Sequence, residues 1–218
     1  MNPGIHRLVD LEQAITQRLS MPVSQRKNIT LDVLRIDKIH ATISGNKWFK
    51  LRYALQEALQ SERTIVTFGG AFSNHLLATA FSCARLGLRC VGIIRGEEPL
   101  PALSPTLLEC NQLGMQLHFI SREEYGFKEL LYDKFERQFP GSIIVPEGGA
   151  SSLGVQGAAD ILSTAVGQFT HICCSVGTGT MIAGLVNSSS EYQFVMGFSA
   201  LKIPENDNSI EEFINEAT

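Results

Sequence analysis

Short runs of β-branched and aromatic residues alternate with stretches of helical periodicity from residue 30 onward, and this alternation constrains the fold more than any other feature. Strands are predicted at 30–37, 64–68, 89–95, 115–120, 142–145, 170–175 and 193–199. Apolar residues recur at helical spacing in 47–60, 73–86, 104–113, 122–139, 152–166 and 179–187. Because a parallel connection needs about a dozen residues, usually a helix, the pattern predicts an α/β fold with largely parallel sheets.

Composition and charge argue against several classes of protein. Of the 218 residues, 44% are hydrophobic and 18% are charged, which is typical of a globular chain. The formal net charge of -4 and the scattered Lys and Arg residues argue against a nucleic-acid partner. The N-terminus has no apolar leader, and no apolar run reaches the ~20 residues of a membrane span. We therefore expect a soluble, cytoplasmic protein without a membrane partner.

The cysteines form an odd set with no CxxC pair, so we expect reduced, mostly buried thiols and no metal site. They are Cys83, Cys90, Cys110, Cys173 and Cys174. The last two are adjacent in a predicted strand, where neighbouring side chains face opposite sides.

Glycines gather where predicted strands pass into helices, in FGGAFSN (68–74), PEGGASSLG (146–154) and SVGTGT (175–180). In open parallel sheets, ligands bind at the carboxyl ends of the strands. These three junctions from separate parts of the chain are therefore candidates to converge on one cleft.

The junction in SVGTGTMIAGLV (175–186) suits a phosphate, because the unpaired N–H groups at a helix start carry the positive end of its dipole. Thr178 and Thr180 add hydroxyl donors. It is not a Walker loop, since no GK[ST] follows. Its glycines are spaced GxGxxxxG, and no ribose-binding acid follows the next strand, so a nicotinamide-dependent oxidoreductase is the weaker alternative. A turn that serves packing alone is another.

Lys47 opens an amphipathic helix in ISGNKWFKLRYALQEAL (43–59). Most lysines occupy solvated helix faces, an interpretation that fits Lys50 and Arg52. Lys47 differs because it stands at the mouth of the helix. There, the positive dipole end and a partly apolar setting lower the pKa of the amine and make it available for Schiff-base chemistry.

A third segment, TFGGAFSNHLLATAFSCARLG (67–87), places Ser73, Asn74 and His75 at a helix N-terminus. Ser and Asn are ordinary N-caps, but the same unpaired N–H groups also suit a carboxylate. His75 is either a general base or a structural hydrogen-bonding residue.

Together these segments resemble the pyridoxal 5'-phosphate (PLP) dependent enzymes of fold type II, the tryptophan synthase β-subunit-like group. The matching segments, in the order in which the family has them, are SGNKWFKLRYAL, FGGAFSNHLLATA, VPEGGASSLGVQGAADI and VGTGTMIAGL. The chain is most similar to the 1-aminocyclopropane-1-carboxylate deaminase and D-cysteine desulfhydrase branch. The resemblance implies two open parallel-sheet lobes with flanking helices: a large PLP-binding lobe from 1–51 and 148–218, incomplete at its C-terminus, and a small lobe from 52–147.

The resemblance also implies the roles of the site residues. Lys47 would hold the cofactor through a Schiff base, and Asn74 would bond its phenolic oxygen. The phosphate would be held by Gly177, Thr178, Gly179 and Thr180. Ser73, Asn74 and His75 would receive the substrate carboxylate, and in the deaminase Ser73 would also lie near the reacting carbon.

The reaction implied is loss of ammonia from a small amino acid, with freed Lys47 as general base or acid. D-Cysteine would give pyruvate, ammonia and sulfide, whereas the cyclopropane amino acid would give 2-oxobutanoate and ammonia. The SNH at 73–75 is more similar to the desulfhydrases, since the deaminases more often carry SNQ. Desulfhydrase-like elimination is therefore favoured, and the deaminase is the alternative. Members of the family commonly form homodimers, so the resemblance implies a possible homodimer here.

The resemblance departs from the family at the C-terminus, because members continue well beyond the position of Thr218. That region normally completes the large lobe and supplies a Ser or Thr near the pyridine nitrogen. Tyr192 does not match the tyrosine that the deaminases place above the cofactor. The remaining hypothesis is a truncated, non-catalytic PLP-binding remnant.

Overall fold

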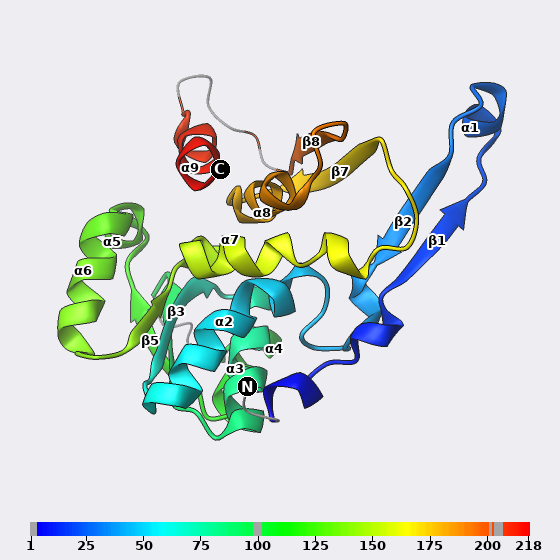
Figure 1. Ribbon diagram of the computed structural model, residues 1–218. Helices are drawn as coiled ribbons and strands as arrows, with labels where there is room; N and C mark the ends of the chain where they lie inside the picture. The colour runs from blue at the N-terminus through cyan, green and yellow to red at the C-terminus, as the bar shows by residue number, and fades with distance from the viewer. Residues whose placement is uncertain (1–3, 98–101, 201, 203–206) are drawn as a thin grey trace.

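A computed structural model describes residues 4–97, 102–200, 202 and 207–218 (Figure 1). Within these residues the strands form a parallel sheet of order β5-β4-β3-β6, a pair β7-β8 and a hairpin β1-β2. The strands are β1 (Ile15–Leu19), β2 (Leu31–Arg35), β3 (Ile65–Gly70), β4 (Cys90–Arg95), β5 (Gln116–Ile120), β6 (Ile143–Val145), β7 (His171–Val176) and β8 (Phe194–Ser199). The α-helices are α1 (Pro22–Arg26), α2 (Asn46–Ser61), α3 (Asn74–Leu86), α4 (Pro105–Gln112), α5 (Arg122–Gly126), α6 (Lys128–Gln138), α7 (Ser152–Ala159), α8 (Thr180–Ser188) and α9 (Ser209–Ala217). Single 3-10 turns lie at Ile5–Arg7, Leu11–Gln13, Ile36–Lys38, Glu147–Gly149 and Leu162–Thr164.

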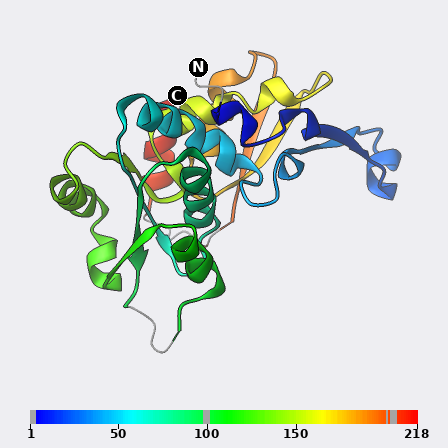
Figure 2. The ribbon, with the colours of Figure 1, turned by 90° about the horizontal axis from the view of Figure 1, so that it is seen from below.

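The four-stranded sheet has helices on both sides (Figure 2). β3 lies between β4 and β6, with Ile65 opposite both Cys90 and Ile143. Because successive strand residues face opposite sides, β3 supplies two cores. Val66 and Phe68 pack with residues of α5 and α6, whereas Ile65 joins the larger core with α2 and α3. Because both faces of β3 are buried, its sequence is mostly apolar and does not alternate between apolar and polar residues.

Three helices stack in the order α2, α7, α8 (Figure 1). Two glycines permit this close approach. A Cβ on Gly157 of α7 would overlap the carbonyl oxygen of Phe49 in α2. A Cβ on Gly184 of α8 would lie 2.5 Å from the Cβ of Ala158. The stack joins the lysine helix to the helix that follows β7.

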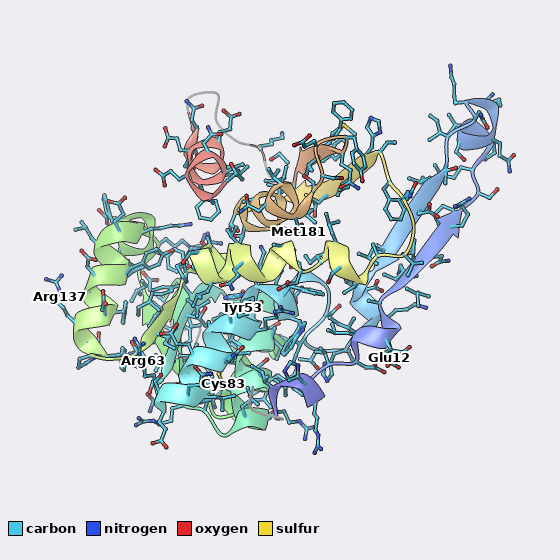
Figure 3. The ribbon with its side chains drawn as sticks, in the orientation of Figure 1. Glu12, Tyr53, Arg63, Cys83, Arg137 and Met181 are labelled. Atoms are coloured by element: carbon cyan, nitrogen blue, oxygen red, sulfur yellow. The ribbon has the colours of Figure 1, made fainter. Side chains whose placement is uncertain are left out.

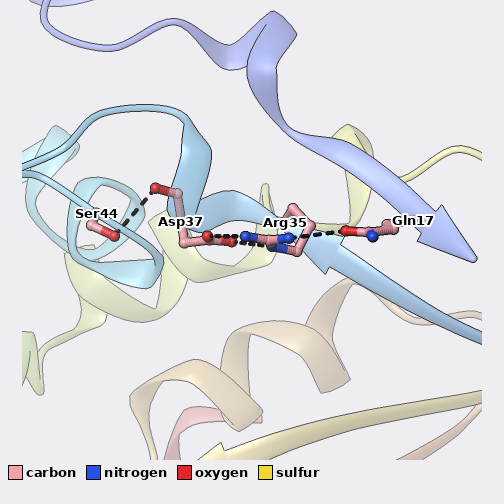
Figure 4. A network of polar contacts seen from close by, with 4 residues as sticks. All are labelled: Gln17, Arg35, Asp37 and Ser44. Atoms are coloured by element: carbon pink, nitrogen blue, oxygen red, sulfur yellow. Dashed lines mark hydrogen bonds and ion pairs between the residues drawn. The ribbon is translucent and has the colours of Figure 1, made fainter. Parts of the chain in front are cut away.

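The β1-β2 hairpin is antiparallel, with Ile15 opposite Arg35. Arg35 at the end of β2 donates to Gln17 Oε1 at 2.9 Å and pairs with Asp37 at 2.7 Å (Figure 4). Ser44 Oγ donates to the Asp37 carbonyl at 3.4 Å. The hairpin base therefore holds the turn that enters α2.

Most predicted elements are confirmed, each to within a few residues. The predicted helix 122–139 is instead two helices, because α5 ends at Gly126 and Phe127 takes a non-helical ψ of 67°. The predicted helix 152–166 ends as an α-helix at Ala159. Strand β1 and helix α1 were not predicted. The expected lobe boundary at 51/52 falls inside α2, and the lobe division stays a prediction.

Two further expectations can be compared with the described residues. The five cysteines are free thiols, of which Cys173 is exposed and Cys174 is buried, as expected of strand neighbours. Among the residues described, no helix is both long and apolar enough to cross a bilayer.

Gly157→Ala tests the close approach of α2 and α7. Because the new methyl group would meet backbone, which cannot swing aside, we expect the free energy of unfolding to fall by about 1–3 kcal/mol or more. Urea denaturation followed by circular dichroism measures it. Gly126→Ala is the matched control, since open space surrounds that position. Equal midpoints for the two variants would contradict the packing described.

Candidate active site

Lys47 is the second residue of α2 and is partly buried. The preceding Gly45 takes φ 64° and ψ -140°, a conformation that favours glycine and turns the chain into the helix. Lys47 Nζ donates to Asn46 Oδ1 at 2.9 Å. Burial lowers the pKa of the Lys47 amine, the direction that favours the neutral nucleophile. Asn46 Nδ2 also lies 3.2 Å from the sulfur of Met181, labelled in Figure 3, so the start of α2 touches the start of α8.

Lys50 lies one helical turn after Lys47, and the prediction of a solvated position for it is wrong. Its exposed fraction is only 6%, and among the described residues its Nζ has no hydrogen-bond or ion-pair partner. Burial, together with the charge of Lys47, lowers the pKa of Lys50 to about 7. An amine that is largely removed from solvent and has no carboxylate partner gains from a nearby anion, so this position suits an anionic ligand. Arg52, the other residue given a solvated position, is partly buried and pairs with Asp160 of α7.

The turn between β7 and α8 presents backbone donors. Gly179 caps α8 with φ 81°, and Thr180 is fully buried. The hydroxyls of Thr178 and Thr180 lie 2.9 Å apart and bond to each other. Within the described part of the chain, no backbone carbonyl accepts from the N–H groups of Gly177, Thr178 or Gly179. Consecutive free N–H groups at a helix start form an anion-binding site.

Gly148 and Gly149, from the junction after β6, lie between the other parts of the site. A Cβ on Gly148 would lie 2.9 Å from Thr178 Cγ2. A Cβ on Gly149 would lie 3.0 Å from Lys50 Cβ and 3.7 Å from His75 Cε1. The junctions after β6 and β7 therefore lie beside each other, and Lys50 and the start of α3 border the first of them.

The first turn of α3 borders the same glycines. Ser73 is its N-cap, and its Oγ accepts from the N–H of Leu76 at 3.3 Å, so the hydroxyl proton stays available as a donor. Asn74 is exposed. His75 is only 3% exposed, and burial lowers its pKa to about 3, helped by the charges of Lys47 and Lys50. The structure thus brings His75 near both lysines, and Ser73 and Asn74 directly precede it at the start of α3.

Two features that bear on the site were missed from the sequence. The general preference of lysines for solvated helix faces predicts an exposed Lys50. Its i,i+3 spacing from Lys47, however, puts both lysines on one side of α2. Thr67, fully buried on β3, is hydrogen-bonded to His75. A single threonine within an apolar strand does not indicate from the sequence that it contacts a site residue.

The residues present fit a ligand that carries both a phosphate and an aldehyde. The free N–H groups at residues 177–179 and the unpartnered ammonium of Lys50 complement a phosphate dianion. Lys47, with its lowered pKa, supplies the amine that reacts with an aldehyde. PLP combines these two groups in one molecule.

Comparison with known proteins gives a consistent result. A relative from Thermotoga maritima, named as a 1-aminocyclopropane-1-carboxylate deaminase, is 37% identical over 75% of this chain and 55% of its own. The bifunctional D-cysteine desulfhydrase/1-aminocyclopropane-1-carboxylate deaminase of Arabidopsis thaliana is 32% identical over 70% of this chain and 43% of its own. The crystal structure of an ACC deaminase homologue superposes with a TM-score of 0.75 at 26% identity, covering 100% of this chain and 72% of that one.

The chain thus spans about half the length of these curated relatives. The structural match confirms the predicted α/β fold of PLP enzymes of fold type II. The model of the family described as pyridoxal-phosphate dependent enzymes matches residues 34–202, which include every candidate site residue and most of the chain. This chain therefore belongs to the family of pyridoxal-phosphate dependent enzymes, with PLP as its cofactor.

Proposed function

We propose that the protein is a PLP-dependent lyase that deaminates a small amino acid by desulfhydrase-like α,β-elimination, giving a keto acid, ammonia and sulfide. The observation that carries this proposal is the convergence of a partly buried lysine of lowered pKa with a cradle of free backbone N–H groups. The names of the relatives support it, because they include deaminases and desulfhydrases.

Lys47 is the proposed covalent anchor of the cofactor. The N–H groups of 177–179 and the hydroxyls of Thr178 and Thr180 hold the phosphate. We add Lys50 to the predicted set, since a phosphate would pair with the amine of this mostly buried side chain. Charge neutralisation of this kind is stronger inside a protein than in water.

The start of α3 is the proposed substrate site. Its unpaired N–H groups and the hydroxyl of Ser73 suit the substrate carboxylate, because a helix N-terminus favours negative charge. Asn74 is exposed towards solvent in the ligand-free chain, and its amide donates to the phenolic oxygen of the cofactor in this proposal.

When bound, PLP supplies an electron sink for charge released at the substrate carbon. The chain has to position the substrate and move the proton. Lys47 is the proposed general base at the α-carbon, a role that requires its neutral form and is favoured by burial. Ser73, the N-cap of α3, is proposed to stand near the reacting carbon.

A 1-aminocyclopropane-1-carboxylate deaminase is the second candidate, favoured by the name of the Thermotoga maritima relative. The Thermotoga maritima relative is named for the deaminase alone and the Arabidopsis thaliana relative for both activities, so the substrate is a matter for experiment. A cytoplasmic location and a homodimer also remain proposals.

Keto-acid release decides between these functions. The purified chain is incubated with PLP and, in separate reactions, D-cysteine, the cyclopropane amino acid, and D- and L-serine. We expect pyruvate and sulfide from D-cysteine. 2-Oxobutanoate from the cyclopropane substrate alone would favour the deaminase. Visible cofactor binding without release of either keto acid would favour the non-catalytic hypothesis.

Lys47→Ala is expected to abolish covalent attachment of PLP. Borohydride reduction of the wild-type chain with PLP, followed by peptide mass mapping, should place the cofactor on Lys47. The variant should lose this product and at least about a hundredfold of any lyase rate, because both anchor and base are removed. Lys38→Ala, at an exposed position, is the control. A reduced adduct on another lysine in the wild type would overturn the assignment.

Lys50→Met is expected to weaken phosphate binding. 4'-Deoxypyridoxine 5'-phosphate lacks the aldehyde, so its affinity reports the phosphate contacts without the bond to Lys47. A hydrogen bond to a charged group contributes about 1.5–3 kcal/mol, so the affinity should fall roughly ten- to hundredfold. Lys27→Met, at an exposed position, should bind like the wild type.

The pH dependence gives a second readout for Lys50. A phosphate stabilises the protonated amine and raises its pKa above the value of about 7 in the ligand-free chain. From about pH 7 upward, where the phosphate stays a dianion, wild-type affinity should therefore fall as the pH rises, while Lys50→Met should show little change over that interval. A wild-type affinity that rises with pH would contradict this role.

A further inference from the structure

A short chain of hydrogen bonds lies beneath the start of α3. Thr67 Oγ1 lies 2.9 Å from the carbonyl oxygen of Val145 and 3.0 Å from His75 Nε2. Thr67 belongs to β3, Val145 ends β6, and His75 is the second residue of α3. Thr67 is fully buried and His75 is 3% exposed, so water has little access to these groups.

The donors and acceptors in this chain can be arranged in one way. The Val145 carbonyl only accepts, so the hydroxyl of Thr67 must donate its single proton to it. Thr67 Oγ1 then accepts, and His75 Nε2 must carry the proton of the second bond. A neutral imidazole has one N–H, so His75 Nδ1 is left as a bare acceptor.

Protonation of this ring is disfavoured by its surroundings. A second N–H at Nδ1 would have no acceptor, because that atom is buried and has no partner among the described residues. The titratable groups that bear on the ring are Lys47 and Lys50 of α2, both of which oppose another positive charge. With burial as the larger cause, the pKa of His75 is held near 3.

We infer that His75 is a positioning residue and not a proton carrier: its Nε2–H, held by Thr67, fixes the first turn of α3 against the middle of β3 and the end of β6. The inference rests on the proposed function, in which this turn receives the substrate carboxylate. The bond ties the carboxylate site to two strands whose C-terminal ends also place Gly70 and the Gly148–Gly149 junction. Small misplacements of a binding group lower the rate steeply, so this tie controls substrate alignment.

Side-chain replacements separate the two roles. In His75→Gln the amide N–H reaches Thr67 in place of Nε2–H, yet the side chain cannot titrate. A positioning role predicts that His75→Gln and Thr67→Ser retain kcat/KM to within several-fold. Thr67→Val and His75→Leu should each lose about tenfold or more, mainly through a higher KM for the substrate. The double variant Thr67→Val/His75→Leu should be no worse than the poorer single variant, because all three lack the same bond.

A proton carrier would behave differently. His75→Gln would then lose about a hundredfold or more in kcat and one limb of its pH profile. That result would overturn the inference. Urea denaturation of each variant shows whether a loss reflects unfolding, and rescue by Thr67→Ser excludes a simple packing defect at that position.

Nuclear magnetic resonance of the ligand-free full chain tests the tautomer without any turnover. In protein labelled with ¹⁵N-histidine, the spectrum of His75→Gln identifies the His75 ring among the five histidines. We expect a protonated Nε2 and an unprotonated Nδ1, unchanged between about pH 8 and pH 5. An Nδ1–H tautomer, or a ring that titrates in that range, would refute the inference even if the wild-type chain proves to be an active lyase. Absence of keto-acid release by the wild type would instead count against the proposed function alone.

Discussion

The stack of α2, α7 and α8 is the constraint on which the rest of the site depends. Gly157 lets the backbone of α7 approach the Phe49 carbonyl of α2, and Gly184 lets α8 approach Ala158 on the other side of α7. Larger residues would separate the helices by the width of their side chains. Only at this spacing does the start of α2 reach the start of α8, where Asn46 meets Met181. The start of the lysine helix and the turn between β7 and α8 are thereby brought together.

The electrostatics of the cleft follow from this geometry. The start of α2 touches the start of α8 through Asn46 and Met181, and each of these helix starts carries the positive end of a helix dipole. Lys47 and Lys50 add two amines one turn apart, both with lowered pKa values. Positive potential in a partly desolvated site is unfavourable in the free chain and favourable once an anion binds. This arrangement of charges therefore favours an anionic ligand.

The sequence predicted the elements well where one physical signal was strong. The apolar run of β3 and the helical spacing of α2 gave their bounds to within two residues, because a strand buried on both faces and an amphipathic helix have distinct patterns. Strand β1 was missed because three of the five residues of ITQRL are polar, so the segment lacks the apolar pattern of a buried strand. The break at Gly126 was missed because apolar spacing continues across it.

The sequence by itself determined the alternation of strands and helices, the position of the Gly-rich junctions, and the placement of Lys47 at the start of α2. These are local properties, since periodicity, turn chemistry and helix ends depend on residues near in sequence. The tertiary structure alone decided that Lys50 is buried and without a partner, and that Thr67 fixes the tautomer of His75. Burial and hydrogen-bond pairing depend on which distant segments pack together, and no local pattern encodes those contacts.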